Sequence, residues 1–484
     1  MNGPLRRLAV VAFALFASLL ASTTWIQFVT AGDLRADGRN SRTLLEELGR
    51  ERGPILVGDA AVVTSVPVDD RFKFQRTYSP GELYAHVTGF SSVVFGATGI
   101  EGTESERLTG TSDEQFYRRV SDLLTGTEPQ GASITLTLDA EVQQAAWDAL
   151  GDQRGAVVAL DPGTGAILAM VSKPSYDPNA VATHDTGAAA AARDALLADP
   201  ADPLINRAIG GNLYPPGSVF KIVTAAAAIE RGDVDENTVL PGPAVLDLPQ
   251  TSADLPNSGG SACGPNGEVS LTNALRNSCN TAFGYLGLEL GDGVLRDQAQ
   301  AFGFGQELRV PLRVSQSSVP AELDPPQKAQ AAIGQFDVRV TPLQVAMVSA
   351  AVANGGELMR PNLVAEVRGA DLDLIDRPTP QSMGTAVSTE TAQALTRMMV
   401  TVVEDGTGTA AQIDGVPVAG KTGTAQHEPG RAPHAWFTAF APADDPQVAV
   451  AVVVEEGGTA GDEASGGRTA APIARAVMEA VVSR

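Results

Sequence analysis

The sequence predicts a multidomain α+β protein with an N-terminal membrane anchor, a small α+β pedestal domain and one larger domain. Three observations support this prediction. The chain has 484 residues, 43% of them hydrophobic and 19% charged, which is enough for roughly two to four ordinary domains. One apolar segment near the N-terminus is long enough to cross a bilayer. Beyond about residue 132, strand patterns at both ends enclose a region of helix patterns, which predicts one sheet closed by terminal segments with a helical region inserted.

The anchor is expected within residues 1–31. Arg6 and Arg7 precede a charge-free stretch from Leu8 to Gly32, and a spanning helix needs about 20 mostly apolar residues. A cleavable signal peptide has an apolar core of only about 7 to 15 residues, so we expect an uncleaved anchor; the alternative is a mature chain that begins after about residue 22. Basic residues ahead of the span predict a cytoplasmic N-terminus and a body outside the cytoplasm.

Residues 32–132 are expected to form the pedestal. A charged stretch leads into two glycine-rich stretches, with no long helical pattern and no cluster of catalytic residue types. The whole chain has 34 basic and 57 acidic residues, a formal net charge of −23. This charge argues against nucleic acid or anionic lipid as a partner.

The larger domain is expected over residues 133–484. It begins with a strand in ITLTLD, a helix in EVQQAAWDAL and two strands around the turn Asp161-Pro162-Gly163. Helix patterns follow, among them SVFKIVTAAAAIERG and TPLQVAMVSAAVANGG. The chain ends with strands in VPVAGKTGTAQ, HAWFTAFAP and QVAVAVVVEE and a helix from Ala471 to about Val482.

Ser218 and Lys221 form a candidate catalytic pair. The expected helix from Ser218 to Glu230 is apolar or small on every side, which predicts that it is buried. Residues three apart share a helix face, so the amine could reach the hydroxyl. Burial and the helix dipole would both lower the pKa of the lysine toward that of a general base. The alternative is a capping serine followed by a solvated lysine.

Ser278-Cys279-Asn280 lies between two helix patterns, where a short turn could point a hydroxyl and an amide into a cleft; the alternative is a helix N-cap. Lys421-Thr422-Gly423 falls in a predicted strand. A cation, a hydroxyl and a glycine in an extended segment suit a carboxylate ligand whose backbone lies alongside.

That strand also fits the phosphate-loop pattern Gly-x-x-x-x-Gly-Lys-Thr from Gly415 to Thr422. A phosphate loop requires a helix directly after the threonine. The following residues, GTAQHEPGRAPH, contain two glycines and two prolines, so we reject a nucleotide site.

Cys263 and Cys279 are the only cysteines, and the expected compartment favours a disulfide between them over two unrelated buried thiols. In the chain-entropy model, so short a loop gives about 3 kcal/mol of stabilisation. The chain also has only five lysines. We expect Lys73, Lys173 and Lys328 on the surface, Lys221 to be driven toward neutrality and Lys421 to stay charged.

The three motifs occur once each, in the order Ser-x-x-Lys, Ser-x-Asn, Lys-Thr-Gly. This set is typical of penicillin-binding proteins and class A β-lactamases. The chain resembles the class B penicillin-binding proteins, and most closely the actinobacterial penicillin-binding protein A group. ERGPIL, RTYSPGELYAHVTGF and GATGIEGTESERLTG are similar to that group's N-terminal domain, and IGQFDVRVTPLQVAMVSAAVANGG and GGRTAAPIARAV to its transpeptidase domain.

The resemblance implies a dimerisation-type pedestal and a transpeptidase domain with an antiparallel sheet, helices on both sides and an inserted helical subdomain. It implies a peptidoglycan D,D-transpeptidase that cross-links stem peptides, releases the terminal D-alanine and is acylated by β-lactams. Ser218 would be the nucleophile, Lys221 would accept its proton, and Ser278 would pass a proton to the leaving amine.

The binding roles also follow from the resemblance. Asn280 would hold the peptide group of the donor, and Lys421 and Thr422 would bind its terminal carboxylate. Gly423 and Thr424 would complete the substrate-binding segment. The backbone N–H groups of Ser218 and Thr424 would form the oxyanion hole. No metal or cofactor is expected.

Partners implied by the resemblance are a membrane glycan polymerase and division proteins, with a role at the septum. Two alternatives stay open: a β-lactamase, and a non-catalytic β-lactam receptor or divisome scaffold. A bifunctional class A protein is disfavoured because the pedestal is too short to hold a glycosyltransferase domain.

Overall fold

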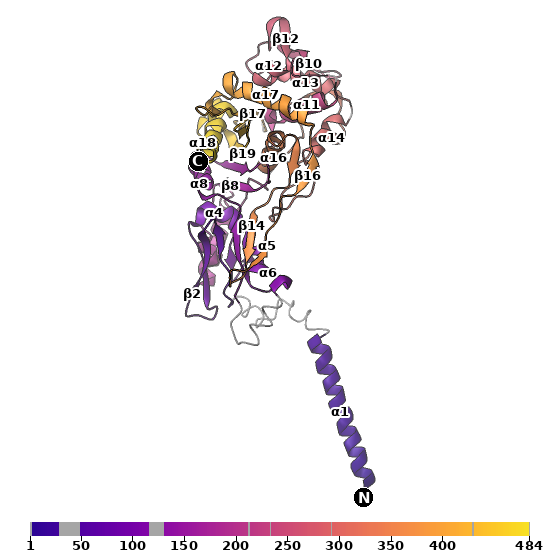
Figure 1. Cartoon of the computed structure of the whole chain (residues 1–484), viewed down its shortest axis with the longest axis vertical. Coiled ribbons are helices and arrows are strands. Elements are labelled where there is room, and N and C mark those ends of the chain that lie inside the picture. Colours follow the sequence, from indigo (N-terminus) through magenta and orange to yellow (C-terminus); the bar gives the residue numbers. More distant parts are fainter. Residues whose placement is uncertain are drawn as a thin grey trace.

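The computed structural model describes residues 2–28, 49–115, 130–211, 213–232, 234–291, 293–427 and 430–483. Residues 29–48, which hold most of the charged stretch after the apolar segment, lie outside these ranges, as does the part of the expected pedestal between residues 116 and 129. Figure 1 shows the order of the elements along the chain.

The N-terminal segment is one helix, α1 (Asn2–Phe28). Residues Gly3–Gln27 are long and apolar enough to cross a membrane, and none of this span is buried against the rest of the protein. Phe13 and Phe16 are 76% and 71% exposed. A helix with such a surface, about 40 Å long at 1.5 Å per residue, fits a single-pass anchor through a hydrocarbon layer of about 30 Å.

A six-stranded sheet forms the pedestal, in the order β15-β14-β6-β1-β2-β3. The pairing of β1 with β6 is parallel, and the other pairs are antiparallel. Its strands are β1 (Ile55–Val57), β2 (Ala60–Pro67), β3 (Phe74–Tyr78), β6 (Ser133–Leu136), β14 (Val364–Arg368) and β15 (Leu374–Asp376). Short elements accompany them: α4 (Gly81–Thr88), β4 (Ser91–Ser92), β5 (Gly96–Ala97), α5 (Gly99–Thr103), α6 (Ser105–Leu108) and a 3-10 turn η1 (Asp113–Gln115).

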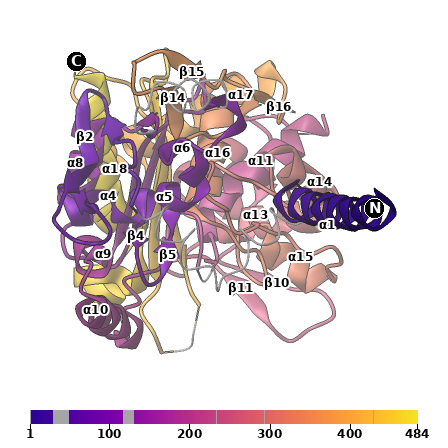
Figure 2. The ribbon, with the colours of Figure 1, turned by 90° about the horizontal axis from the view of Figure 1, so that it is seen from below.

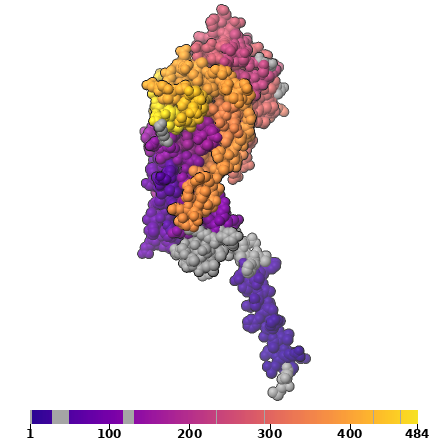
Figure 3. Space-filling view, in the orientation of Figure 1, coloured from indigo at the N-terminus to yellow at the C-terminus, as the bar shows by residue number. Residues whose placement is uncertain are grey.

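The pedestal sheet therefore takes strands from three distant parts of the sequence. β6 follows the proposed boundary near residue 132, and β14 and β15 come from the middle of the larger domain. Figure 3 shows the orange segment that contains β14 and β15 on the surface of the pedestal.

The larger domain is built on a five-stranded antiparallel sheet in the order β17-β18-β19-β7-β8. Its strands are β7 (Gly155–Leu160), β8 (Ile167–Lys173), β17 (Ala419–Ala425), β18 (His434–Ala441) and β19 (Val448–Val454). They come from the two ends of the domain, as the sequence predicts.

Helices cover both faces of this sheet (Figure 2). On one face lie α8 (Ala140–Leu150) and α18 (Ala471–Val482), packed on side chains such as Val157 and Val450. On the other face lies α16 (Pro342–Ala353), packed on side chains such as Val158 and Ala449. Both faces are apolar because successive strand residues point to opposite sides and both sides are covered.

The inserted helical region lies between β8 and β17. Its helices are α9 (Asn179–Ala182), α10 (Thr186–Ala198), η2 (Gly217–Phe220), α11 (Lys221–Glu230), α12 (Leu271–Arg276), α13 (Asn280–Glu289), α14 (Val294–Ala301), α15 (Pro325–Ala331) and α17 (Thr389–Asp405). Short strands and turns connect them: β9 (Val239–Pro241), β10 (Val245–Asp247), β11 (Asp254–Pro256), η3 (Pro265–Gly267), β12 (Glu268–Ser270), β13 (Glu357–Met359), β16 (Ser382–Thr385) and η4 (Thr409–Ala411). After β19 come η5 (Glu455–Glu463) and a π-helical turn η6 (Gly466–Ala470).

One expectation about the lysines is wrong. Lys173, expected on the surface, is 9% exposed. Its amine lies 3.9 Å from the centre of the Trp147 ring and donates to the Trp147 and Gly151 carbonyls. The aliphatic stem of a lysine can be buried when its charged end finds such partners, and no local pattern around residue 173 signals them.

Candidate active site

Ser218 and Lys221 occupy the junction between a 3-10 turn and a helix. The turn η2 contains Ser218, and Lys221 is the first residue of α11. Gly217 before them has φ of +55°, and a Cβ there would lie 2.7 Å from the Thr424 carbonyl oxygen, so only glycine fits this close approach. Ser218 is half-buried, whereas Lys221 is completely buried.

The Lys221 amine is held by the second motif. Its Nζ donates to the Ser278 carbonyl oxygen and to Asn280 Oδ1, both at 2.8 Å, and lies 3.4 Å from Ser278 Oγ. Burial, followed by repulsion from Lys421, holds the pKa of Lys221 well below its usual range. A neutral amine has two N–H groups and one lone pair, so these two short bonds leave the lone pair available to take a proton.

The spacing of Ser218 and Lys221 is therefore only part of the site. Among the hydrogen bonds of the described residues, none joins the Ser218 hydroxyl to the Lys221 amine. Ser218 lies in η2 and Lys221 begins the helix that follows, and the Lys221 amine points toward Ser278 and Asn280.

Ser278 lies in the turn between α12 and α13, and Asn280 is the first residue of α13. Ser278 has φ of +57°, in the left-handed region that costs about 1 to 2 kcal/mol for a residue with a side chain. Its hydroxyl accepts a hydrogen bond of 2.9 Å from Lys421 Nζ. The hydroxyl of Ser278 therefore lies between two lysine amines.

Lys421 and Thr422 lie on strand β17. Lys421 is completely buried, and its Nζ also donates to the Thr422 carbonyl at 2.9 Å. Thr422 Oγ1 is 2.7 Å from Thr407 Oγ1. Burial lowers the pKa of Lys421 to about 7, so the expectation that this lysine is charged holds only at the acidic side of neutrality in the unliganded protein.

Gly423 brings β17 close to the turn that contains Ser218. A Cβ at this position would lie 2.9 Å from Trp436 Cβ, 3.0 Å from Val219 Cγ1 and 3.1 Å from the Pro216 carbonyl oxygen. The glycine of the third motif is therefore needed for the contact between β17 and η2.

These residues meet at one cleft of about 830 Å³. Ser218, Ser278, Asn280, Thr422, Gly423 and Thr424 border it. Lys221 and Lys421 lie beneath its surface. Among the described residues, those that line the cleft include no acidic side chain, although the whole chain has a formal net charge of −23. This lining suits an anionic ligand.

Several residues of the cleft lie outside the three motifs. Asn257 and Phe336 come from loops, Thr407 from the turn after α17, and residues 464–467 from the segment before α18. Phe336 is 41% exposed and has φ of +60°, which is uncommon for so large a residue. None belongs to a motif, because each reaches the cleft through the tertiary fold.

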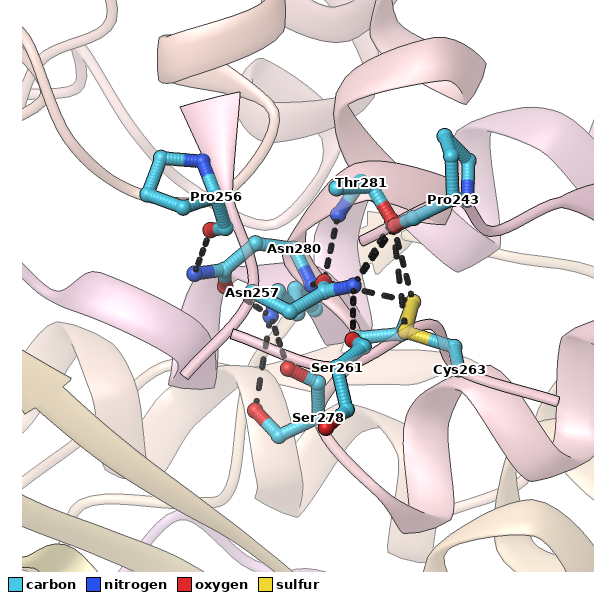
Figure 4. The surroundings of a disulfide bond; sticks show 10 residues. Pro243, Pro256, Asn257, Ser261, Cys263, Ser278, Asn280 and Thr281 are labelled. Atoms are coloured by element: carbon cyan, nitrogen blue, oxygen red, sulfur yellow. Dashed lines mark hydrogen bonds between the residues drawn. A yellow bond between two sulfur atoms is a disulfide. The ribbon is translucent and has the colours of Figure 1, made fainter. Parts of the chain in front are cut away.

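A disulfide lies next to the second motif (Figure 4). Cys263 and Cys279 are bonded, with their Cα atoms 6.0 Å apart. Cys279, between Ser278 and Asn280, is 2% exposed. The bond therefore fastens the residues before α13 to the loop around Cys263.

Within the described ranges, no group of three or more His, Cys, Asp or Glu side chains could hold a metal ion.

Two family domains match the chain. Residues 155–479 match the penicillin binding protein transpeptidase domain, and residues 52–134 match the penicillin binding protein A dimerisation domain. The peptidoglycan D,D-transpeptidase PbpA of Mycolicibacterium smegmatis is 47% identical over 491 aligned positions, which cover 100% of this chain and 99% of the relative. PbpA of Mycobacterium tuberculosis is 45% identical with the same coverage.

Solved structures agree with these matches. The ceftriaxone acyl-enzyme complex of penicillin-binding protein A from M. tuberculosis superimposes with a TM-score of 0.87 at 44% identity, over 90% of this chain and 100% of that one. Penicillin binding protein 3 from the same organism is more distant, with a TM-score of 0.72 at 26% identity over 89% of this chain and 95% of that one. Together with the site geometry, these matches show that the chain belongs to the class B penicillin-binding protein transpeptidases.

Proposed function

We propose that this protein is a peptidoglycan D,D-transpeptidase that cross-links stem peptides through an acyl-enzyme on Ser218. The observation that carries the proposal is the pair of buried lysines on either side of Ser278, beneath a cleft that Ser218 borders. The relatives named as D,D-transpeptidases and the acyl-enzyme structure support it.

Acylation would begin when Ser218 Oγ attacks the carbonyl carbon between the last two D-alanines of a stem peptide. Lys221 would take the serine proton on its free lone pair, since burial and the nearby Lys421 lower its pKa and thereby favour the neutral amine. The C–N bond then breaks, and Ser278 would relay the proton from Lys221 to the departing D-alanine amine, so that Lys221 and Ser278 return to their starting protonation states. An amine of a neighbouring stem would next attack the ester, form the cross-link and return a proton to Ser218.

Substrate binding would use residues of the second and third motifs. Lys421 and Thr422 would hold the terminal carboxylate, which favours the protonated form of Lys421. Asn280 would hold the donor's peptide group. The N–H groups of Ser218 and Thr424 would face the developing oxyanion; both residues border the cleft. Gly423 would let the extended donor lie along β17.

We further infer that α1 anchors the protein in the cell membrane with its N-terminus in the cytoplasm and its catalytic domain outside. Arg6 and Arg7 before the apolar stretch support this orientation. We propose activity in septal wall synthesis, with a membrane glycan polymerase and division proteins as partners.

Mass spectrometry of the full-length chain in detergent, incubated with penicillin, tests the proposal. We expect a stable adduct on the peptide that contains Ser218, and none on a Ser218→Ala variant. A thioester donor with a D-amino acid acceptor should give the exchanged product. Rapid nitrocefin turnover would indicate a β-lactamase, and a stable adduct without exchange product a receptor; either result would overturn the proposal.

A further inference from the structure

The first turn of α13 lacks a cap from its own sequence. Cys279 is the N-cap residue, but its side chain is used in the disulfide and makes no capping hydrogen bond. The first N–H groups of a helix need acceptors from elsewhere. Asn257 supplies one: its Oδ1 accepts from the backbone N–H groups of Asn280 at 2.9 Å and Thr281 at 3.0 Å.

The other end of the Asn257 amide is also occupied (Figure 4). Its Nδ2 donates to the Pro243 carbonyl at 2.8 Å, the Ser261 carbonyl at 3.0 Å and Thr281 Oγ1 at 3.1 Å. Asn257 is 7% exposed. A buried amide with all its groups paired is held in one orientation, because any rotation leaves donors or acceptors unsatisfied.

The residues at the start of α13, which Asn257 caps, hold the amine of Lys221. Asn280 Oδ1 and the Ser278 carbonyl receive the two short hydrogen bonds from Lys221 Nζ. The Ser278 hydroxyl receives a hydrogen bond from Lys421. A shift of residues 278–280 would therefore move the hydrogen-bond partners of Lys221 and of Lys421 together.

We propose that Asn257 is a positioning residue for the transpeptidase reaction. It caps α13 from a distant loop and thereby sets the place of Ser278 and Asn280 against Lys221. The inference rests on the proposed function of these residues. Asn257 acts through Asn280 and the turn before it, and has no part in bond making.

The asparagine and the disulfide have separate tasks. The Cys263–Cys279 bond limits how far the two segments can separate. It leaves the direction of the α13 N–H groups free, and the Asn257 carbonyl fixes that direction through its two hydrogen bonds.

The test uses the full-length chain in detergent and stopped-flow acylation with penicillin, which separates the binding constant from the acylation rate constant. A displacement of about 1 Å at catalytic groups costs up to about 100-fold. We expect Asn257→Ala to lower the acylation rate constant by about 10- to 100-fold with a much smaller change in the binding constant. Asn273→Ala removes the same amide from an exposed site on α12 and should leave both constants unchanged.

Asn257→Asp keeps the oxygen acceptor for the helix N–H groups and loses the donors to the loop carbonyls. We expect it to retain the acylation rate constant within a few-fold of the wild type. Its negative charge next to the turn should move the pH profile of acylation to higher pH, since a nearby anion raises the pKa of Lys221. A role in loop stability alone would leave the Asp variant as impaired as the Ala variant, whereas the shift of the profile reports the new charge in either case.

Three results would overturn the inference. The first is a folded Asn257→Ala protein with a wild-type acylation rate constant, and the second is an Asp variant slowed as much as Ala. In an Asn280→Ala background, Asn257→Ala should cost less than in the wild type, because part of its effect passes through the Asn280 side chain; full additivity would also overturn the inference. Failure of the proposed function is read separately, from the wild-type protein alone: no adduct on Ser218, rapid nitrocefin turnover, or a stable adduct without exchange product.

Discussion

The pKa of Lys421 leads to a specific pH dependence for ligand binding. Burial lowers this pKa to about 7 in the free protein, and a carboxylate beside the amine would favour its charged form. At pH values above the pKa of Lys421 in the free protein, ligand binding must therefore be accompanied by the uptake of one proton. The perturbation is a change of pH applied to a Ser218→Ala variant, in which binding is measured without acylation.

The size of the effect follows from the titration of a single group. With a pKa of about 7, the charged fraction of Lys421 falls from about nine tenths at pH 6 to about one tenth at pH 8. The dissociation constant of a penicillin should thus rise about tenfold over this range.

Isothermal titration calorimetry of the Ser218→Ala protein with benzylpenicillin measures both the dissociation constant and the proton uptake, the latter from buffers of different ionisation enthalpy. The methyl ester of the same penicillin lacks the carboxylate and is the matched control, with a constant that should not change with pH. Lys421→Arg should bind the acid with little pH dependence, because guanidinium stays charged. A flat curve for the acid with the parent protein, or an equal slope for the ester, would refute the reasoning.

Three further predictions concern the same region. Lys221→Met should slow acylation of Ser218 by about 100- to 10,000-fold, as measured by stopped flow, because it removes the proton acceptor; an unchanged rate would exclude that role. Replacing Cys263 and Cys279 by serine together should lower the free energy of unfolding in urea by about 3 kcal/mol for the bridge's separation of 16 residues. A decrease in the free energy of unfolding of less than about 1 kcal/mol would contradict this prediction. Gly423→Ala should cost about 1 to 3 kcal/mol by overpacking against its neighbours, and it should slow acylation by pushing β17 from η2; a stable variant with normal acylation would contradict this.

Local patterns were sufficient where a residue's surroundings are set by its own element. The apolar helix after Ser218 predicted the burial of Lys221, and the structure has both. The alternating and apolar strands at the two ends of the larger domain predicted its central sheet. The motif residues that border the cleft were identifiable because their spacing is itself a chemical pattern.

Other features depend on contacts between distant parts of the chain. Lys421 looked like a charged strand residue, yet the sheet is covered on both faces, and its pKa falls for that reason. Asn257 reaches a helix that begins 23 positions later, and its backbone partners leave no trace in residue types. Lys173 is buried by an aromatic ring on another element. Sequence periodicity describes one element at a time and contains no information of this kind.

The arrangement of the pedestal sheet also determines the order in which the protein can be completed during synthesis. β6 pairs with β1 on one side and with β14 on the other. When the first of these pairs can form, β14 has still to be synthesised, together with most of the inserted helices. Until then the far edge of β6 has unpaired backbone groups, which other chains can bind. The pedestal is thus the first part of the body to begin folding and cannot finish until β14 arrives, so slow synthesis of the helical region would prolong the aggregation-prone stage.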